Sequence, residues 1–314
     1  MNYKQLNYTI TIWREKSFSK AAKKMKISQP AISQQLINLE EYLGFVIFDR
    51  QSNPLIPTQR GLAFLLEAEK LNLQFKQLNE YGLSLENNQQ GDLILGIIPT
   101  ISSFLISLFI NDFREKHPDI NLSIVEMKTE GIVEGLLDRT IHAGIIATPI
   151  KSRVKFSKSV LFYEKFQIFC SEEHPFFELD EIALQKPHYK DLWVLREGNC
   201  FSNQVINICN LDKFYNQNLQ YACDSIDALM RVVNHCGGFT FIPELATLDM
   251  SEEEELKLRV IKGKESVREI SMIYIKNEPN APLLELISKS IRGNLPKRML
   301  TKDNKRVVPT DVDL

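Results

Sequence analysis

The sequence predicts an α/β protein with an N-terminal winged helix-turn-helix, a long connecting helix and a larger domain of alternating strands and helices. Three observations lead to this prediction. Two short helical patterns between Ser17 and Gly44 precede a short hairpin, and residues 59–87 form one long helical pattern. Beyond residue 92, short apolar runs alternate with helical patterns. A chain of 314 residues is long enough for two domains.

The positive charge of the chain is concentrated at its N-terminus. Residues 1–60 carry nine Lys and Arg against four Asp and Glu, a balance of +5, which leaves 29 against 36, or −7, for the remainder. The chain begins without the apolar segment of a signal peptide, and no apolar run approaches the about 18 residues of a membrane span. We therefore expect a soluble cytoplasmic protein whose first 60 residues bind an anionic polymer.

The helical patterns between Ser17 and Gly44 predict a helix-turn-helix. Ser19 and Ser28 are expected to cap the two helices, with Pro30 in the first turn of the second. The second helix has an apolar stripe of Ile32, Leu36, Leu39 and Leu43, which leaves Ser33, Gln34 and Asn38 off it. Amide side chains can read base edges, and lysines can contact phosphates; the lysines are Lys20, Lys23, Lys24 and Lys26. These helices alone are equally compatible with a small bundle whose polar residues are merely solvated.

The residues that follow favour the DNA-binding interpretation. Gly44 ends the second helix, FVIFDR and LIPT form a hairpin wing, and Thr58 caps the next helix. The stretch AAKKMKISQPAISQQLINLEEYLGFVIFDR, followed by PTQRG, resembles the DNA-binding domain of LysR-type transcriptional regulators, which gives a domain of residues 1–58. The resemblance implies double-stranded promoter DNA as a partner and places Arg50 at the backbone contact near the wing. It also implies groove contacts by Ser28, Gln29, Pro30, Ser33 and Gln34.

A linker of residues 59–90 is expected to hold a dimerisation helix and a hinge. The helical pattern carries an apolar series of Leu62, Leu65, Leu66, Leu73 and Leu78. Its roughly 29 residues would span over about 40 Å, and such a helix cannot bury its stripe without a partner. The sequence thus predicts a dimer, and the resemblance implies a homotetramer. The hinge is expected at ENNQQGD, residues 86–92.

Residues 91–295 are expected to form a two-lobed effector domain. The strand-like runs are residues 93–98, 122–127, 142–147, 166–171, 192–195, 239–243 and 269–276, and the helical patterns are residues 103–116, 130–138, 200–210, 225–236 and 281–292. This alternation predicts parallel sheets, with Thr100 and Thr129 just beyond carboxyl ends of strands, where ligands bind. By resemblance, the lobes are periplasmic-binding-protein-like. The polar, aperiodic segment 296–314 is expected to be a mobile tail.

No catalytic or metal-binding motif stands out. The chain lacks GxxxxGK[ST], GxGxxG and HExxH, and its five histidines are scattered without ligand spacing. Five cysteines without a CxxC pair indicate reduced thiols. We expect no cofactor, no metal ion and no enzymatic activity as the main role, so any reactive chemistry depends on the cysteines.

Cys200 and Cys209 lie in one predicted helix that keeps their thiols apart. Nine residues at about 1.5 Å place their Cα atoms roughly 13 Å apart on opposite faces, whereas a disulfide needs about 7 Å or less. The pair is therefore either two unrelated thiols or a switch that rebuilds the local fold. Asn199 can cap this helix, and the helix N-terminus favours a reactive thiolate at Cys200. Inert buried cysteines are the commoner case, and we assign Cys170, Cys223 and Cys236 to it.

A second resemblance bears on this pair. The combination of IIPT (97–100), KT (128–129), REGNC (196–200), Cys209, GGFTFIP (237–243) and VREISMIYIK (267–276) is similar to the peroxide-sensing members of the LysR family. It implies that Cys200 is the peroxidatic sensor and Cys209 the resolving cysteine. It further implies that Thr100 and Thr129 bind hydrogen peroxide and that Arg268 favours the thiolate. Asn199 and Ser202 stand where such members carry histidine and arginine, so the thiolate depends more on Arg268 and the helix terminus.

The sequence thus predicts a regulator that binds promoter DNA, senses hydrogen peroxide through a Cys200–Cys209 disulfide and controls oxidative-stress genes. The resemblance adds RNA polymerase as a partner. One alternative is a LysR-type regulator gated by a small metabolite between the lobes, with incidental cysteines. Another is a thiol peroxidase, against which the helix-turn-helix argues.

Overall fold

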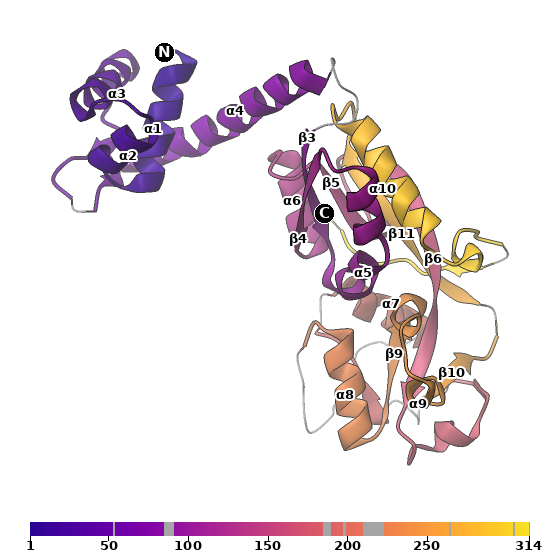
Figure 1. Cartoon of the computed structure of the whole chain (residues 1–314). Coiled ribbons are helices and arrows are strands. Elements are labelled where there is room, and N and C mark those ends of the chain that lie inside the picture. Colours follow the sequence, from indigo (N-terminus) through magenta and orange to yellow (C-terminus); the bar gives the residue numbers. More distant parts are fainter. Residues whose placement is uncertain are drawn as a thin grey trace. The chain divides into compact units, whose positions relative to one another are not determined.

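The computed structural model describes residues 1–52, 54–84, 91–184, 190–196, 199–209, 223–263, 265–303 and 305–313. The chain divides into two compact units, Met1–Glu86 and Asn87–Leu314 (Figure 1). Of the hinge predicted at residues 86–92, residues 86–90 lie outside the described part, and the last two begin a strand. Among the described residues, no helix is long and apolar enough to cross a membrane.

The first unit is the predicted winged helix-turn-helix with one additional helix. Its elements are α1 (Tyr3–Glu15), α2 (Phe18–Lys24), α3 (Gln29–Leu43), β1 (Phe48–Asp49), β2 (Ile56–Pro57) and α4 (Gln59–Ser84). The sequence analysis did not predict α1, which begins at a capping box formed by Asn2 and Gln5. In α3, the cap at Ser28 and the end at Gly44, in a left-handed conformation, are confirmed.

The predicted cap at Ser19 is wrong. Ser17 caps α2 instead, because its side chain accepts a hydrogen bond from the backbone N–H of Lys20. The Ser19 hydroxyl donates to Gln29 Oε1 over 2.8 Å and so links α2 to the start of α3. Two serines near the start of a helix offer equivalent caps in a sequence, and the direction in which the chain enters the helix selects one of them.

The apolar stripe of α3 forms the core of this unit. Ile32, Leu36 and Leu39 are buried against Ala21 and Ala22 of α2 and against residues of α1 and the wing. Among the leucines of the expected α4 stripe whose side chains are described, Leu62, Leu66 and Leu78 are exposed and Leu65 is buried. The side chain of Leu73 lies outside the described part. Leu71, Phe75 and Leu78 line an apolar hollow of about 440 Å³ together with Met1, Tyr3 and Leu6. The dimer itself remains a prediction.

The larger unit is built on one mixed sheet. The strands β4 (Ile120–Glu126), β3 (Gly91–Ile97) and β5 (Ala143–Thr148) are parallel, as predicted. The next strands, β11 (Ser266–Ile275) and β6 (Phe156–Cys170), are antiparallel, which corrects the expectation of parallel sheets. Strands β5 and β6 each pair with β11 in the antiparallel sense, so they run in the same direction on either side of it and are joined by residues 149–155.

The long strand β6 joins the two lobes. Its first half pairs with β11, and its second half pairs with β9 (Phe239–Pro243) and β10 (Leu258–Ile261) (Figure 1). The short strands β8 (Leu192–Trp193) and β7 (Glu181–Ile182) extend this second half. The helices are α5 (Pro99–Lys116), α6 (Thr129–Leu137), α7 (Cys200–Cys209), α8 (Ile226–Cys236), α9 (Glu252–Glu255) and α10 (Ala281–Gly293). Each lobe has its own core of buried side chains.

The segment after Pro296 is packed, which contradicts the predicted mobile tail. It contains a short 3₁₀ helix at Lys297–Met299 and the strand β12 (Arg306–Val307), which pairs in parallel with β11. Met299, Val308, Thr310 and Val312 are buried. This strand is not evident in the sequence, because single apolar residues at alternating positions do not form a run long enough to indicate a strand.

The close approach of α4 to the wing can be tested at Gly61. An added Cβ at this position would lie 1.9 Å from the carbonyl oxygen of Ile47, a backbone atom that cannot rotate away. Gly61→Ala should therefore destabilise the N-terminal unit by about 1–3 kcal/mol, measured by thermal or urea unfolding. Gly293→Ala is the control, because nothing lies within 4 Å of its added Cβ. Equal stability of the two variants would show that α4 does not approach the wing as described.

Candidate functional site

The site begins at the N-terminus of α7. The Asn199 side chain accepts a hydrogen bond from the N–H of Phe201 over 2.9 Å, and the Asn199 carbonyl accepts from Asn203 over 3.1 Å. The predicted cap is thus confirmed, and Cys200 is the first residue of the helix. Residues 197 and 198, just before this cap, lie outside the described residues.

Arg268 is the charged centre of the site. It lies on β11, its side chain is 0% exposed, and the guanidinium donates hydrogen bonds toward three different elements. Nη2 donates to Thr100 Oγ1 (3.0 Å), Nη1 to Glu164 Oε1 (3.0 Å) and Nε to Gln204 Oε1 (3.2 Å). The guanidinium carbon also lies 4.8 Å from the ring centre of Phe201. A charge buried this completely is held only because its donors are matched.

The Cys200 thiol is buried beside this guanidinium. The pKa of the Cys200 thiol is raised, because burial outweighs the positive charge and hydrogen bond of Arg268 and a hydrogen bond to Thr129, all of which lower that pKa. Glu130, the next residue along α6, raises the pKa because its negative charge opposes a thiolate. The electrostatics therefore make Arg268 the principal group that can favour a Cys200 thiolate.

Four of the predicted site residues meet here. Thr100 lies in the first turn of α5, directly after β3, and Thr129 begins α6, just after β4, so both occupy the carboxyl edge of the parallel strands. Together with Cys200 and Arg268, they form one buried polar cluster. The hydroxyl of Thr129 and the guanidinium of Arg268 thus direct hydrogen bonds to the sulfur of Cys200.

Cys209 does not belong to this group. It ends α7, and it is buried in the core of the second lobe, whereas Cys200 packs in the core of the first. Neither cysteine is in a disulfide, and over ten residues of helix their Cα atoms are about 13 Å apart. A bond between them therefore requires α7 to unwind.

Sequence reasoning missed two residues of the site, Gln204 and Glu164. Gln204 lies one turn after Cys200, is 0% exposed, and donates from Nε2 to the carbonyl of Val308 over 2.8 Å. Glu164 lies on β6, is also 0% exposed, and accepts from the N–H of Leu245 over 3.2 Å. An acidic residue inside the apolar run around Phe162 and Phe166 was the signal, since a charge in a buried strand needs a partner.

Complete burial changes the acidity of Glu164. Its pKa is raised to about 7, because burial opposes ionisation more than Arg268 and the Leu245 N–H favour it, and the charge of Glu244 adds to the effect. Arg268 also forms hydrogen bonds with Cys200, Thr100 and Gln204. The site thus holds two acidic groups, a carboxyl and a thiol, around one cation.

The residues expected to contact DNA lie together at the start of α3 and at the wing. Ser28, Gln29, Pro30 and Gln34 are exposed, Ser33 is half-buried, and Gln34 donates to Asn38 over 2.9 Å. Arg50, at the wing, forms an ion pair of 2.6 Å with Glu40. Lys24 is paired with Glu15, whereas Lys23 is exposed on α2. The polar face of α3 is available to a groove.

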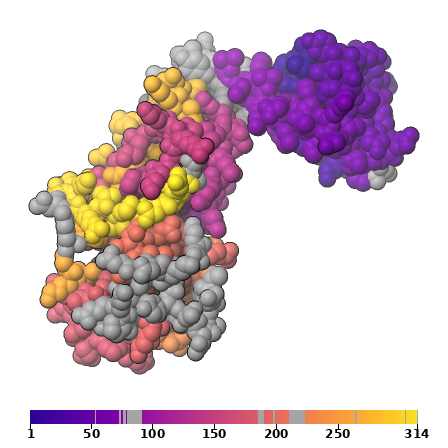
Figure 2. Space-filling model, turned by 180° about the vertical axis from the view of Figure 1, so that it is seen from behind, coloured from indigo at the N-terminus to yellow at the C-terminus, as the bar shows by residue number. Residues whose placement is uncertain are grey.

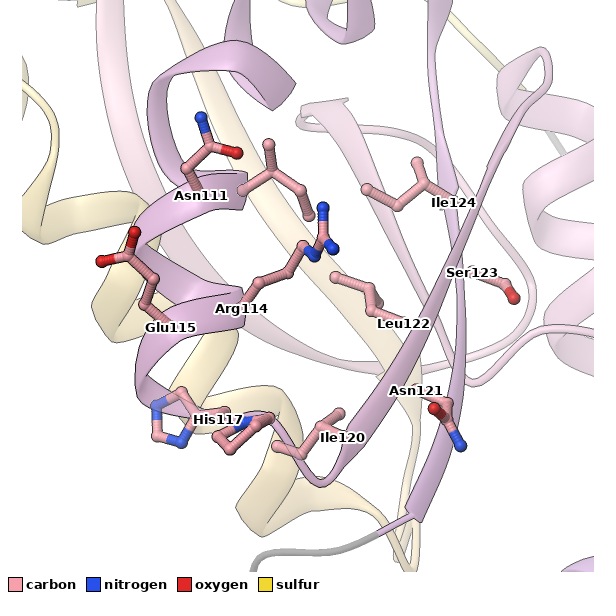
Figure 3. A pocket seen from close by; sticks show the side chains of 11 residues that line it. Asn111, Arg114, Glu115, His117, Ile120, Asn121, Leu122, Ser123 and Ile124 are labelled. Carbon is pink, nitrogen blue, oxygen red and sulfur yellow. The ribbon is translucent and has the colours of Figure 1, made fainter.

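A separate groove of about 950 Å³ lies along the outer edge of the sheet (Figure 3). Asn111, Arg114 and Glu115 of α5 line one side, and Asn121 and Leu122 of β4 line the other. Its lining includes none of the four site residues Thr100, Thr129, Cys200 and Arg268.

The other cysteines differ from one another. Cys170 is buried, and its thiol donates to the carbonyl of Lys257, but Cys236 is exposed, which corrects the expectation of an apolar setting. Cys223 is half-buried. Among the described residues, no cluster of His, Cys, Asp and Glu is placed to hold a metal ion.

Comparisons with known proteins agree over nearly the whole chain. Residues 86–295 match the LysR substrate binding domain, and residues 3–62 match the bacterial regulatory helix-turn-helix protein of the lysR family. The hydrogen peroxide-inducible genes activator of Haemophilus influenzae is 27% identical over 90% of this chain and 92% of its own length. A full-length OxyR variant from Pseudomonas aeruginosa aligns with a TM-score of 0.71 and 24% identity, over 93% of this chain and 98% of that one. Reduced OxyR from Porphyromonas gingivalis aligns with a TM-score of 0.61 and 27% identity, over 69% and 99%.

Glu164 should give the folded chain a characteristic pH dependence. The pKa of its carboxyl is raised from 4.5 to about 7 on folding. Between these values the folded state therefore holds a proton that the unfolded chain has released. Its contribution to stability is fully present below pH 4.5 and is lost as the pH rises through 7.

Glu164→Gln removes this titration. Between pH 5 and 7.5 the wild type should therefore lose more stability than the variant, by a few kcal/mol (order of magnitude), measured by urea unfolding at each pH. The slope is the decisive quantity, since the variant also changes the partner of Arg268 and so its absolute stability. Parallel pH curves for the two proteins would mean that Glu164 is ionised throughout.

Proposed function

This chain belongs to the LysR family of bacterial transcriptional regulators, and we propose that it senses hydrogen peroxide through Cys200 and passes that signal to promoter DNA. It acts in the cytoplasm, where that DNA is accessible, and controls genes of the response to oxidative stress. The observation that carries the proposal is the buried group in which Cys200 meets Arg268, Thr100 and Thr129.

The first chemical step is oxidation of Cys200. Its thiolate attacks one oxygen of hydrogen peroxide, the O–O bond breaks, and the products are a sulfenic acid and hydroxide, which takes a proton to become water. Arg268 stabilises the negative charge on sulfur before the attack and on the leaving oxygen after it. Thr100 and Thr129 hold the peroxide by hydrogen bonds in this scheme.

The second step joins Cys200 to Cys209. The Cys209 thiol displaces water from the sulfenic acid, and α7 unwinds to bring the sulfurs together. Cys209 then leaves the core of the second lobe. This local rebuilding of the effector domain is the signal that changes the placement of the DNA-binding domains.

DNA is bound by the helix-turn-helix as a dimer. The polar start of α3 enters the major groove, and Arg50 supports the backbone contact near the wing. The exposed apolar residues of α4 and the hollow they share with α1 suit a partner helix from a second copy. A tetramer, and contact with RNA polymerase during activation, complete the proposal.

The redox step is tested by peptide mapping of the thiols after mild peroxide. Wild type should form a Cys200–Cys209 disulfide, and binding to promoter DNA should change with it. Cys200→Ser should abolish both, whereas Cys209→Ser should keep oxidation of Cys200 but not the bond. A wild-type protein that responds to a metabolite without this disulfide would show that the effector is not peroxide. Steady consumption of peroxide with a reductant would instead indicate a peroxidase.

DNA recognition can be tested separately from redox chemistry. Gln34→Ala should relax base preference by about 1–3 kcal/mol at the contacted position, because a bidentate contact to a base edge is lost. Lys23→Ala should weaken binding to all sequences and lower the slope of affinity against salt by about one. Both are measured by titration of promoter and random duplexes at several salt concentrations. If Gln34→Ala weakens all duplexes equally, Gln34 contacts the backbone only.

A further inference from the structure

Two segments cross from one lobe to the other side by side, α7 and the C-terminal residues 306–313. At its start α7 places Cys200 in the core of the first lobe, and at its end it places Cys209 in the core of the second. The C-terminal segment does the same in reverse, with Val308 in the second core and Val312 in the first. In Figure 2 the yellow C-terminal segment runs across the larger unit between its magenta and orange parts.

Amide side chains of α7 hold this segment. Gln204 Nε2 donates to the carbonyl of Val308 (2.8 Å), and Asn203 Nδ2 donates to the carbonyl of Thr310 (3.1 Å). Asn207 Nδ2 lies 3.2 Å from the carbonyl of Pro309 and 2.7 Å from Asp311 Oδ2. Positions 203, 204 and 207 are neighbours on one face of a helix, so these bonds exist together only while α7 is helical.

The segment is anchored elsewhere at both ends. On one side of α7, β12 pairs with β11, and the N–H of Val308 donates to the carbonyl of Val267, next to Arg268, over 2.9 Å. On the other side of α7, Thr310 Oγ1 donates to the carbonyl of Pro149 over 2.6 Å, and the N–H of Lys151 donates to the carbonyl of Val312 over 2.9 Å. Because the C-terminal segment is hydrogen-bonded on both sides of α7, it holds that helix against the two cores.

We propose that residues 306–313 form a strap that keeps α7 helical in the reduced protein, and that this strap lets go of α7 when the Cys200–Cys209 bond forms. The second half of this statement rests on the proposed function. Unwinding α7 turns Asn203, Gln204 and Asn207 away from a common face, so the amide bonds to the strap break when the sulfurs meet. The strap and the disulfide therefore oppose each other.

Gln204 connects the strap to the site around Cys200. Gln204 donates to the strap with its amide nitrogen and accepts from Arg268 with its amide oxygen. Loss of the strap thus removes one of the two partners that orient Gln204, and Gln204 in turn is a partner of the cation beside Cys200. The strap restrains both ends of the switch, the sensor site and the helix that must unwind.

The test is the rate at which Cys209 is alkylated in the reduced protein, followed by mass spectrometry in a Cys200→Ser background. In the double variant Asn203→Ala and Asn207→Ala, Cys209 should react about tenfold faster, since the loss of hydrogen bonds to the strap favours opening of α7. Alanine is the better helix former, so faster labelling cannot come from a weaker helix. Lys302→Ala, an exposed position before the strap, is the control and should leave the rate unchanged.

Deletion of residues 309–314 should speed labelling at least as much, and an unaltered far-UV spectrum and a cooperative melting transition of the larger unit confirm that this variant folds. Labelling that stays at the wild-type rate in the double variant would overturn the strap. This outcome needs no peroxide and no disulfide, so it is distinct from failure of the proposed function. Release is tested by hydrogen exchange: protection of residues 306–312 should fall in the disulfide-bonded wild type, and unchanged protection would overturn that half.

Discussion

The guanidinium of Arg268 carries a full positive charge inside a site that water does not reach, and the arrangement around it follows from that constraint. Each of its nitrogens needs an acceptor, and the acceptors come from β6 (Glu164), α5 (Thr100) and α7 (Gln204). A strand of the shared sheet is thereby tied to a helix of each lobe. The same charge lies beside Cys200, so the group that organises the fold also offsets part of the effect of burial, which raises the pKa of that thiol.

Helix α7 couples the charged site around Arg268 to the packing of the two lobes. Because Cys200 and Cys209 are buried in different cores, a covalent bond between them is incompatible with the helix that connects them. In the proposed function, a bond between the two sulfurs selects a second packing of the same segment, and the oxidant biases the protein by this local change. The reduced packing is held by buried side chains of α7 and by the C-terminal residues that lie across it.

Much of this could be predicted from the sequence, and the exceptions have physical causes. The stripe of α3, the cap at Ser28 and the ends of β9 follow from local periodicity and capping, which a sequence displays directly. The antiparallel strands β6 and β11, the packed tail and the roles of Glu164 and Gln204 depend on partners about 40 residues or more away in the chain. Ser17 replaced Ser19 as a cap because the path of the entering chain decides between adjacent candidates.

The central claim is that Cys200 is the thiol made reactive toward peroxide by its surroundings. The most direct measurement traps sulfenic acids with a dimedone probe in the Cys209→Ser variant at increasing peroxide and maps the label by mass spectrometry. We expect labelling of Cys200 first, at a rate proportional to peroxide, well before the exposed Cys236. Label that appears on Cys236 as early as on Cys200, or a Cys200 that remains a free thiol, would contradict this account.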